Sequence, residues 1–424
     1  MQGHTFTDTE LLAAARKALY ERSRLLSPDA TLTSLQDLKV WVGEELAFEE
    51  AASTSLGRVL SDLWYAEYLD QLPPLLNKFE RLASAYFVRR GSVPAFHGFC
   101  NAWREGLLRR VLQFAEEDLE IDDHGHAPVP YALLAAGALG RHEQTLEDSD
   151  SYFLVWTRGE GKYFERFSYR ILAILDQLGM LGKDSLGSIP RVIWRGSLCD
   201  WERSVDIDSD QQDHLSHLEQ LADLRHLCGD ESLGLEALAI ARASLADCRD
   251  RGKLTGFAGK AAAAPVALGV FGGIRLERAG EYAGCFNLAG SGLNPLVSGV
   301  RQLAMQHDVE LGTTLARLEA LSAIGALEEQ LVRRLQAAYH QLAGLKIGKE
   351  IALQPAYLDP SELSILEQQK LRAALEAVRQ LQRVIKRGEL AKARRFAKST
   401  TRQASPSEAP AQFSLGSSPL GKEG

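Results

Sequence analysis

Apolar residues in the first quarter of the chain recur at intervals of three and four positions. The clearest series lie within residues 60–69 and 95–120. This spacing places apolar side chains on one face of an α-helix. We therefore expect a helical region over residues 1–120, with the aromatic side chains of its last helix in the core and not around a ligand.

Residues 131–156 break this helical pattern. Two apolar runs, YALLAA and SYFLVW, flank a polar loop that opens with glycines and closes with acidic residues. Short apolar runs bounded by turn residues are typical of buried strands. Helical spacing returns at residues 163–178, and residues 188–198 again have the pattern of a strand. We therefore predict a small sheet near the middle of the chain.

The later part of the chain again has helical spacing. Leucines recur every three residues from Leu215 to Leu227, which favours a helix over a strand. Residues 249–265 are rich in Gly, Ala and Lys, and we interpret them as a linker. The sequence DPSE at 359–362 has the residues that begin a helix, which we expect to run to about residue 387.

These patterns predict an α+β protein with helical regions at both ends and a small mixed sheet between them. The expected boundaries are 1–120 for the N-terminal helical region, 121–250 for the central domain, 265–390 for a helical bundle and 391–424 for a disordered tail. The end of the tail is rich in Ser, Pro and Gly, a composition typical of disorder.

The overall composition narrows the function classes. The chain has 48 basic and 56 acidic residues, so its formal net charge of −8 provides no basic field for nucleic acid. Its five cysteines are scattered singly, which argues against a structural zinc site and for a reducing compartment. Neither a signal peptide nor a membrane span is apparent, so we expect a cytoplasmic protein.

The loop between the two predicted strands contains the residues with candidate chemistry. Asp148 and Asp150 are two positions apart, so on a strand they project from the same face. Adjacent carboxylates suit Mg²⁺ or Mn²⁺, which accompany substrate phosphates. Gly137 and Gly140 would let the backbone approach a phosphate, and Arg141 could add a charge-assisted hydrogen bond.

Two simpler interpretations stay open for this loop. A strand–turn–strand with solvated acidic residues would show the same D-x-D pattern, although the combination with G-x-x-G-R and two apolar strands favours a nucleotide-binding loop. Glu143 could also pair with Arg141, which would make the arginine structural.

The loop sequence GALGRHEQTLEDSD resembles the signature of the polymerase-β-type nucleotidyltransferases. More narrowly, it is similar to bacterial nucleotidyltransferase-type proteins allied to the protein-PII uridylyltransferase, whose motif begins G-S-x-G-R-x-E-Q and ends D-x-D. The likeness continues at residues 190–201, 223–230 and 271–318. It implies a polymerase-β-like nucleotidyltransferase domain at 121–250 and a helical substrate-binding domain at 265–390.

The resemblance implies that NMP is transferred from an NTP to a protein or small acceptor, in signalling or regulation. Asp148 and Asp150 would be the catalytic residues and the ligands of Mg²⁺ or Mn²⁺. The residues expected to bind the nucleotide are Gly137, Ala138, Gly140, Arg141 and Arg195. Arg195 lies in the third predicted strand and could equally be a surface residue.

A third metal-binding carboxylate is harder to assign. Asp223 matches the D-x-R motif of the family and is our candidate, but the surrounding leucine pattern leaves a role in nucleotide or domain contacts open. Asp206, Asp208 and Asp210 form a second acidic series, which a solvated turn explains better.

One departure from the motif supports a second hypothesis. Ala138 stands where the family has serine, so a hydroxyl that would contact phosphate is missing. The chain could therefore be a catalytically impaired nucleotide-sensing or scaffolding module of the same fold. A nucleic-acid-end modifier is a third hypothesis, which the acidic balance disfavours.

Overall fold

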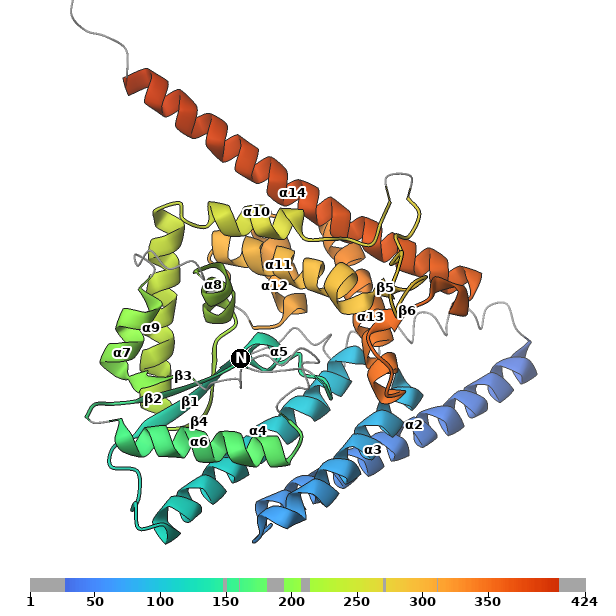
Figure 1. Cartoon of the computed structure of the whole chain (residues 1–424). Helices are drawn as coiled ribbons and strands as arrows, with labels where there is room; N and C mark the ends of the chain where they lie inside the picture. The colour runs from blue at the N-terminus through green and yellow to red at the C-terminus, as the bar shows by residue number, and fades with distance from the viewer. Residues whose placement is uncertain are drawn as a thin grey trace, which may run out of the picture.

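A four-stranded sheet lies among helices contributed by both ends of the chain (Figure 1). The computed structural model describes residues 27–147, 151–159, 161–180, 194–206, 214–269, 272–310 and 312–403. Within these ranges the protein is α+β, as the sequence predicts.

The N-terminal region is helical throughout its described part. Its elements are α2 (Pro28–Trp64), a 3-10 turn η1 (Leu69–Gln71), α3 (Leu72–Arg90) and α4 (Val93–Ile121). Ser27 and Ser92 accept hydrogen bonds from the first turns of α2 and α4, as N-cap residues do. The predicted helical region is thus confirmed over 28–121, whereas residues 1–26 lie outside the described chain.

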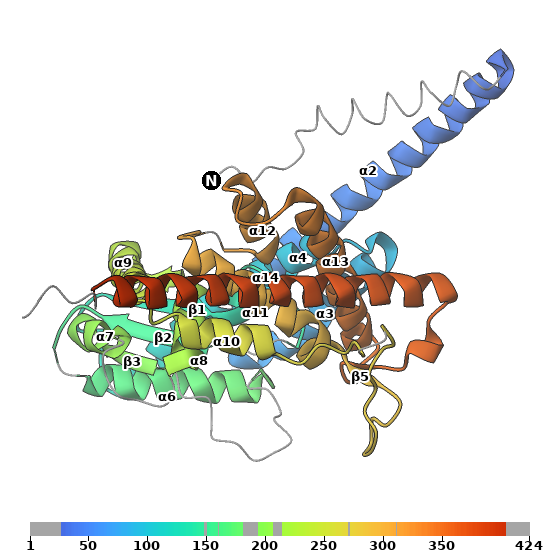
Figure 2. The same cartoon turned by 90° about the horizontal axis from the view of Figure 1, so that it is seen from above.

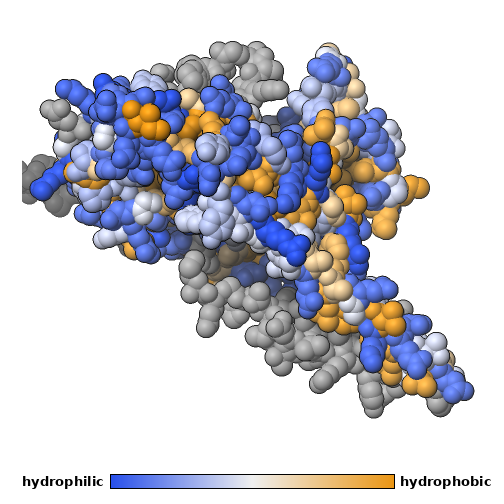
Figure 3. Space-filling model, turned by 90° about the horizontal axis from the view of Figure 1, so that it is seen from below, coloured by the Kyte–Doolittle hydropathy of each residue, from blue (hydrophilic) through white to orange (hydrophobic). Residues whose placement is uncertain are grey.

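The first half of α2 projects from the rest of the described chain (Figure 2). Several apolar side chains on it are exposed, including Leu32, Leu35, Trp41 and Leu46. In the space-filling view they form patches between polar residues along this arm (Figure 3).

The sheet has the strand order β3-β2-β1-β4. The strands are β1 (Tyr131–Ala136), β2 (Ser151–Trp156), β3 (Trp194–Ser197) and β4 (Arg225–Gly229). β1 pairs antiparallel with β2 and β4, and β2 pairs parallel with β3, so the sheet is mixed. This confirms the strands predicted at YALLAA and SYFLVW; of the strand predicted at 188–198, residues 188–193 lie outside the described chain.

Helices cover both faces of the sheet. Leu133 and Ala135 face the core shared with α4 and α6 (Lys162–Gln177), whereas the alternate residues of β1 face α7 (Leu198–Val205) and α9 (Glu231–Asp250). A strand buried on both faces needs apolar residues at every position. This explains why the β1 sequence is continuously apolar instead of alternating.

The helix predicted over the leucines from Leu215 to Leu227 is only half right. α8 (His214–Ala222) ends before Asp223, and β4 begins at Arg225. Leu227 is buried in the strand that pairs with β1. Pairing with the neighbouring strand and burial therefore outweigh the local three-residue period.

The C-terminal region is a helical bundle. Its helices are α10 (Thr255–Ala263), α11 (Asn294–Gln306), α12 (Thr314–Ala323), α13 (Glu329–Ile351) and α14 (Ile365–Gln403), with a π-helical turn η2 (Ala289–Leu293) and two short strands, β5 (Phe286–Asn287) and β6 (Tyr357–Leu358). The linker prediction for residues 249–265 is wrong, because α10 lies there. Its Ala-rich sequence favours a helix, and Phe257, Ala258 and Ala261 are buried.

The last helix begins later and ends later than predicted. Asp359 opens only a 3-10 turn, η3 (Pro360–Glu362), and α14 begins at Ile365. The backbone N–H and hydroxyl of Ser364 both donate to the Glu367 carboxylate at the start of this helix. α14 continues to Gln403, so residues 391–403 are not the disordered segment that the composition predicted, whereas 404–424 lie outside the described chain.

Within the described ranges, none of the helices combines the length and the apolar character that crossing a membrane requires.

Candidate active site and the contacts that surround it

The predicted nucleotide-binding loop leaves β1 through a single helical turn, α5 (Gly137–Gly140). Gly137 has a φ of +76°, a conformation that favours glycine. A Cβ atom on Gly140 would lie 1.9 Å from the carbonyl oxygen of Asp223 and 2.9 Å from that of Ala135. Gly140 is therefore required for the close packing of α5 against the segment before β4.

The structure divides the predicted nucleotide-binding residues into two groups. Gly137 and Ala138 are half-buried at the start of the loop, where a ligand has access to them. Gly140 and Arg141 are buried. The first half of the motif is thus available for binding, while the second half is part of the packed interior.

The guanidinium group of Arg141 is held by two acidic residues. Its Nε donates to Glu143 at 2.8 Å, and its Nη1 donates to Asp223 at 2.6 Å. These contacts support the structural interpretation of Arg141 that the sequence left open. A role for this side chain in binding phosphate stays a prediction that its observed contacts disfavour.

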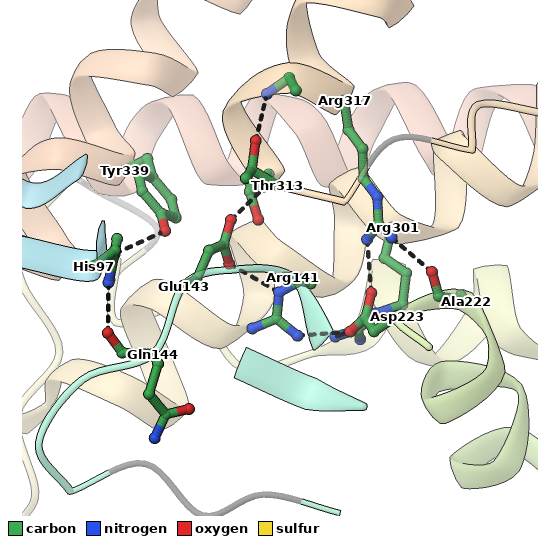
Figure 4. A network of polar contacts seen from close by, with 12 residues as sticks. His97, Arg141, Glu143, Gln144, Ala222, Asp223, Arg301, Thr313, Arg317 and Tyr339 are labelled. Carbon is green, nitrogen blue, oxygen red and sulfur yellow. Dashed lines mark hydrogen bonds and ion pairs between the residues drawn. The ribbon is translucent and has the colours of Figure 1, made fainter. Parts of the chain in front are cut away.

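Asp223 is surrounded by three arginines from three parts of the chain (Figure 4). One carboxylate oxygen accepts from Arg141 and from both Nε and Nη2 of Arg301 on α11, at 2.6 to 2.9 Å. The other accepts from Nη1 of Arg317 on α12 at 2.7 Å. Arg317 also donates to the carbonyl of Ala222 at 2.6 Å.

The electrostatics of this cluster favour an ionised carboxylate. Asp223 is only 2% exposed, and burial alone would raise its pKa, but the positive charges of Arg301, Arg141 and Arg317 hold the pKa well below its usual range. Glu143 supplies a second negative charge, and Glu219 lies 3.6 Å from Arg301. Glu219 also pairs with Lys260 at 3.2 Å, so three acidic side chains face four basic ones.

Glu143 connects the loop to α12 directly. One of its oxygens pairs with Arg141, and the other accepts a hydrogen bond of 2.5 Å from the backbone N–H of Thr314, the first residue of α12. A carboxylate at a helix N-terminus satisfies a free N–H and interacts favourably with the helix dipole. The Thr313 side chain caps the same turn by accepting from Ala316.

The next two residues of the loop contact helices from opposite ends of the chain. The carbonyl of Gln144 lies 2.9 Å from Nδ1 of His97 on α4, whose Nε2 lies 3.2 Å from the Tyr339 hydroxyl on α13. The Thr145 hydroxyl donates to Glu350 on α13 at 3.0 Å and accepts from Lys346 at the same distance. Residues 141–145, which we call the clamp segment, are thus bound to both helical regions.

Arg225, which was not predicted as a site residue, holds α5 from the other side. Its guanidinium donates to the carbonyl of Leu139 at 2.8 and 3.2 Å and to Glu105 on α4 at 2.8 Å. The sequence could have indicated Arg225, because it is the arginine of the D-x-R motif.

Arg195 lies on β3, on the side of the sheet that α6 covers. Its Nη2 donates to Glu165 at 3.0 Å, and its guanidinium lies 5.0 Å from the ring centre of Tyr169. Both partners belong to α6. These contacts give Arg195 a role at the surface of the sheet, and its binding to a nucleotide stays a prediction.

The predicted metal ligands Asp148 and Asp150 lie outside the described residues, as do Asp208 and Asp210. Among the residues that are described, no three His, Cys, Asp or Glu side chains converge in a way that would hold a metal ion. Asp223, the third predicted ligand, does not fit a divalent cation while three guanidinium groups occupy its oxygens. Its contacts instead match the alternative of a domain contact.

Two family models match the chain in succession. Residues 77–213 match a model described as putative nucleotidyltransferase DUF294, and residues 251–388 match one described as a putative nucleotidyltransferase substrate binding domain. A comparison with curated proteins found no match. The first matched region contains α5 and the clamp segment, and the second contains Arg301, Arg317 and Glu350.

Proposed function

Because the chain belongs to the nucleotidyltransferase family that these two models describe, we propose that it transfers a nucleotidyl group from an NTP to a protein or small acceptor. The observation that carries this proposal is the unit formed by β1, α5 and β2. It presents the half-buried backbone of Gly137 and Ala138 next to the segment that leads to Asp148 and Asp150. We further propose that the protein acts in the cytoplasm, in signalling or regulation.

In this proposal the roles within the loop are separate. Asp148 and Asp150 hold Mg²⁺ or Mn²⁺, which neutralises charge on the substrate phosphates when bound. The backbone N–H groups at Gly137 and Ala138 bind a phosphate. Gly140, Arg141 and Glu143 keep this part of the loop in place and do not contact the nucleotide.

The second matched region is the natural place for the acceptor, as its description as a substrate binding domain suggests. Its helices α11, α12 and α13 contact the clamp segment and Asp223 through side chains that are largely buried. We propose that an acceptor bound to this region is held at a fixed distance from the loop, because the polar contacts between them leave little freedom.

A nucleotide-sensing or scaffolding module is the second candidate function. It is favoured by one specific observation, the complete enclosure of Asp223 by three arginines, which removes a carboxylate that the family motif would offer to a metal. The methyl group of Ala138, in place of a serine hydroxyl, also favours it. Both candidates bind an NTP at the same loop, and only the first releases pyrophosphate.

The decisive experiment separates binding from transfer. Purified protein is incubated with Mg²⁺ or Mn²⁺, each α-³²P-labelled NTP and a lysate as the source of acceptor. We expect label on a discrete acceptor and release of pyrophosphate, both lost in the Asp148→Asn/Asp150→Asn double variant. Asp176→Asn, which removes an exposed carboxylate on α6, is the matched control and should transfer label normally.

The remaining outcomes are equally informative. Saturable NTP binding without transfer, lost in the double variant, would establish the sensing function instead. In that case Ala138→Ser, which restores the hydroxyl, should increase NTP affinity. Unchanged NTP affinity in the Asp148/Asp150 variant would remove the assignment of the site.

A further inference from the structure

A cavity of about 80 Å³ lies between residues 221–249, which separate the two matched regions in the sequence, and the second matched region, on the other side of Arg301 and Arg317 from the loop. α8 and α9 form one side of it, and α11, α12 and residues 308–310 form the other. None of the roles proposed above for the catalytic loop uses this space.

Part of the cavity wall is apolar. This part is formed by leucine and alanine side chains of α8 and α9 and by Ala304 and Met305 of α11, and several of these residues, such as Leu221, Ala241 and Ala304, are buried. A somewhat larger apolar cavity, of ~150 Å³, holds a benzene molecule. The space therefore suits a short aliphatic chain.

The entrance has a different chemistry. Two arginines of α9 stand there, each paired with an acidic residue of the segment after α11: Arg249 with Asp308, and Arg242 with Glu310 at 3.6 Å. Arg249 also pairs with the neighbouring Asp250 at 3.1 Å. Asp308 and Glu310 have 65% and 58% of their side chains exposed, so solvent screens both pairs and they contribute little to stability. An anion from solution can replace either acid at small cost.

The inner end of the cavity cannot serve an anion in the same way. Arg301 and Arg317 line it, but both are buried and donate to Asp223 and to neighbouring acceptors. The anionic group of a ligand is therefore stabilised most at the entrance, by Arg249 and Arg242, while the apolar part of the ligand enters between α9 and α11.

Asp308 has a φ of +59° just after α11, in a left-handed helix end that the hydrogen bond from the Val309 N–H to the carbonyl of Ala304 closes at 2.9 Å. Here the conformation directs the Asp308 carboxylate to Arg249.

From these observations we propose that the cavity between α9 and α11 binds a short-chain aliphatic carboxylate, whose carboxylate pairs with Arg249 and Arg242 in place of Asp308 and Glu310. The ligand joins α9, which precedes the second matched region, to α11 of that region, next to the arginines that hold Asp223. It is therefore an effector that favours the observed contact between α9 and α11, and its binding does not depend on nucleotidyl transfer.

Isothermal titration calorimetry of the full chain with isovalerate tests this proposal. Isovaleramide, which has nearly the same shape without the charge, is the paired ligand. We expect saturable binding of isovalerate, at least tenfold weaker binding of the amide, and a rise in the thermal midpoint with isovalerate alone. No heat of binding at millimolar isovalerate, or equal affinity for the amide, would overturn the proposal.

Four variants locate the site. Arg249→Gln should weaken isovalerate binding at least tenfold, whereas Asp308→Asn should strengthen it severalfold, because it removes the competing carboxylate and asparagine tolerates the left-handed backbone. Ala241→Leu should block binding by filling the cavity. Arg251→Gln, an exposed arginine just beyond α9 that pairs with Asp247, should have no effect. Equal affinity in the Arg249 and Asp308 variants would also refute the assignment, whether or not the Ala241 variant folds and whether or not the protein transfers nucleotides.

Discussion

Arg317 and Asp223 are separated by 94 positions in the sequence, yet their side chains meet at 2.7 Å in the interior. Arg317 belongs to the C-terminal bundle, and Asp223 belongs to the segment that connects α8 with β4. Their contact, with those of Arg301 and Arg141, makes a buried carboxylate the centre around which the two matched regions are joined.

Asp223→Asn should destabilise the protein strongly. The amide cannot balance three buried guanidinium groups, and removing one partner of a buried ion pair typically costs about 3–5 kcal/mol. Urea unfolding measures the loss, with Asp176→Asn as the exposed control that should change stability by less than about 0.5 kcal/mol. Equal midpoints for the two variants would mean that the cluster contributes no net stability.

The contribution of Asp223 should depend on pH in a defined direction. Its pKa is lowered in the folded protein, so its ionisation stabilises the fold above the unfolded-state pKa of about 3.9, and this stabilisation is lost as the pH falls below that value. The difference in unfolding free energy between wild type and Asp223→Asn should therefore be constant near neutral pH and shrink below about pH 4. A difference that grows on acidification would contradict this assignment.

Gly140→Ala should displace the loop or unfold the domain. Its methyl group would meet two backbone carbonyl oxygens, which cannot move as a flexible side chain can. Gly259→Ala is the matched control, because this glycine is exposed on α10 and no atom lies within 4 Å of the new methyl group. The control should gain about 0.5–1 kcal/mol of stability, as alanine does in a helix interior. Circular dichroism melting curves of both variants measure the contrast.

The cysteines should differ sharply in reactivity. Burial raises the pKa of the Cys228 thiol to about 12 and that of Cys248 to about 11, so neither forms much thiolate near neutral pH. Cys199 is exposed. Brief treatment of the native protein with iodoacetamide, followed by peptide mass spectrometry, should find Cys199 modified and Cys228 and Cys248 intact. Modification of Cys228 at the same rate would show that β4 opens readily.

Much of the fold could be predicted from local patterns. The apolar runs at 131–136 and 151–156 are short and bounded by turn residues, and they form the two central strands. The predictions of secondary structure are wrong where contacts with residues distant in the sequence determine the structure. β4 has the leucine spacing of a helix but pairs with β1, and α10 has the composition of a linker but packs against α14.

The candidate site was predictable in its residue types and less so in their roles. The motif identified Arg141 and Asp223, but only the structure shows that they contact each other. Arg301 and Arg317 lie in helices with no local signal for chemistry, and nothing in the spacing along the chain indicates that they reach the same carboxylate. The convergence of these charged side chains depends on tertiary packing, which the periodicity of the sequence does not indicate.

The contacts of the clamp segment determine when the loop can fold during synthesis of the chain. Thr145 is bound to Glu350, a residue 205 positions further along the chain, and Gln144 is bound to His97, which precedes it. During synthesis the loop therefore cannot reach its final arrangement until α13 has left the ribosome. Without the C-terminal bundle, Asp223 and Glu143 would keep Arg141 but lose Arg301, Arg317 and the backbone N–H of Thr314. A chain that ends before α13 therefore lacks the contact that holds Thr145.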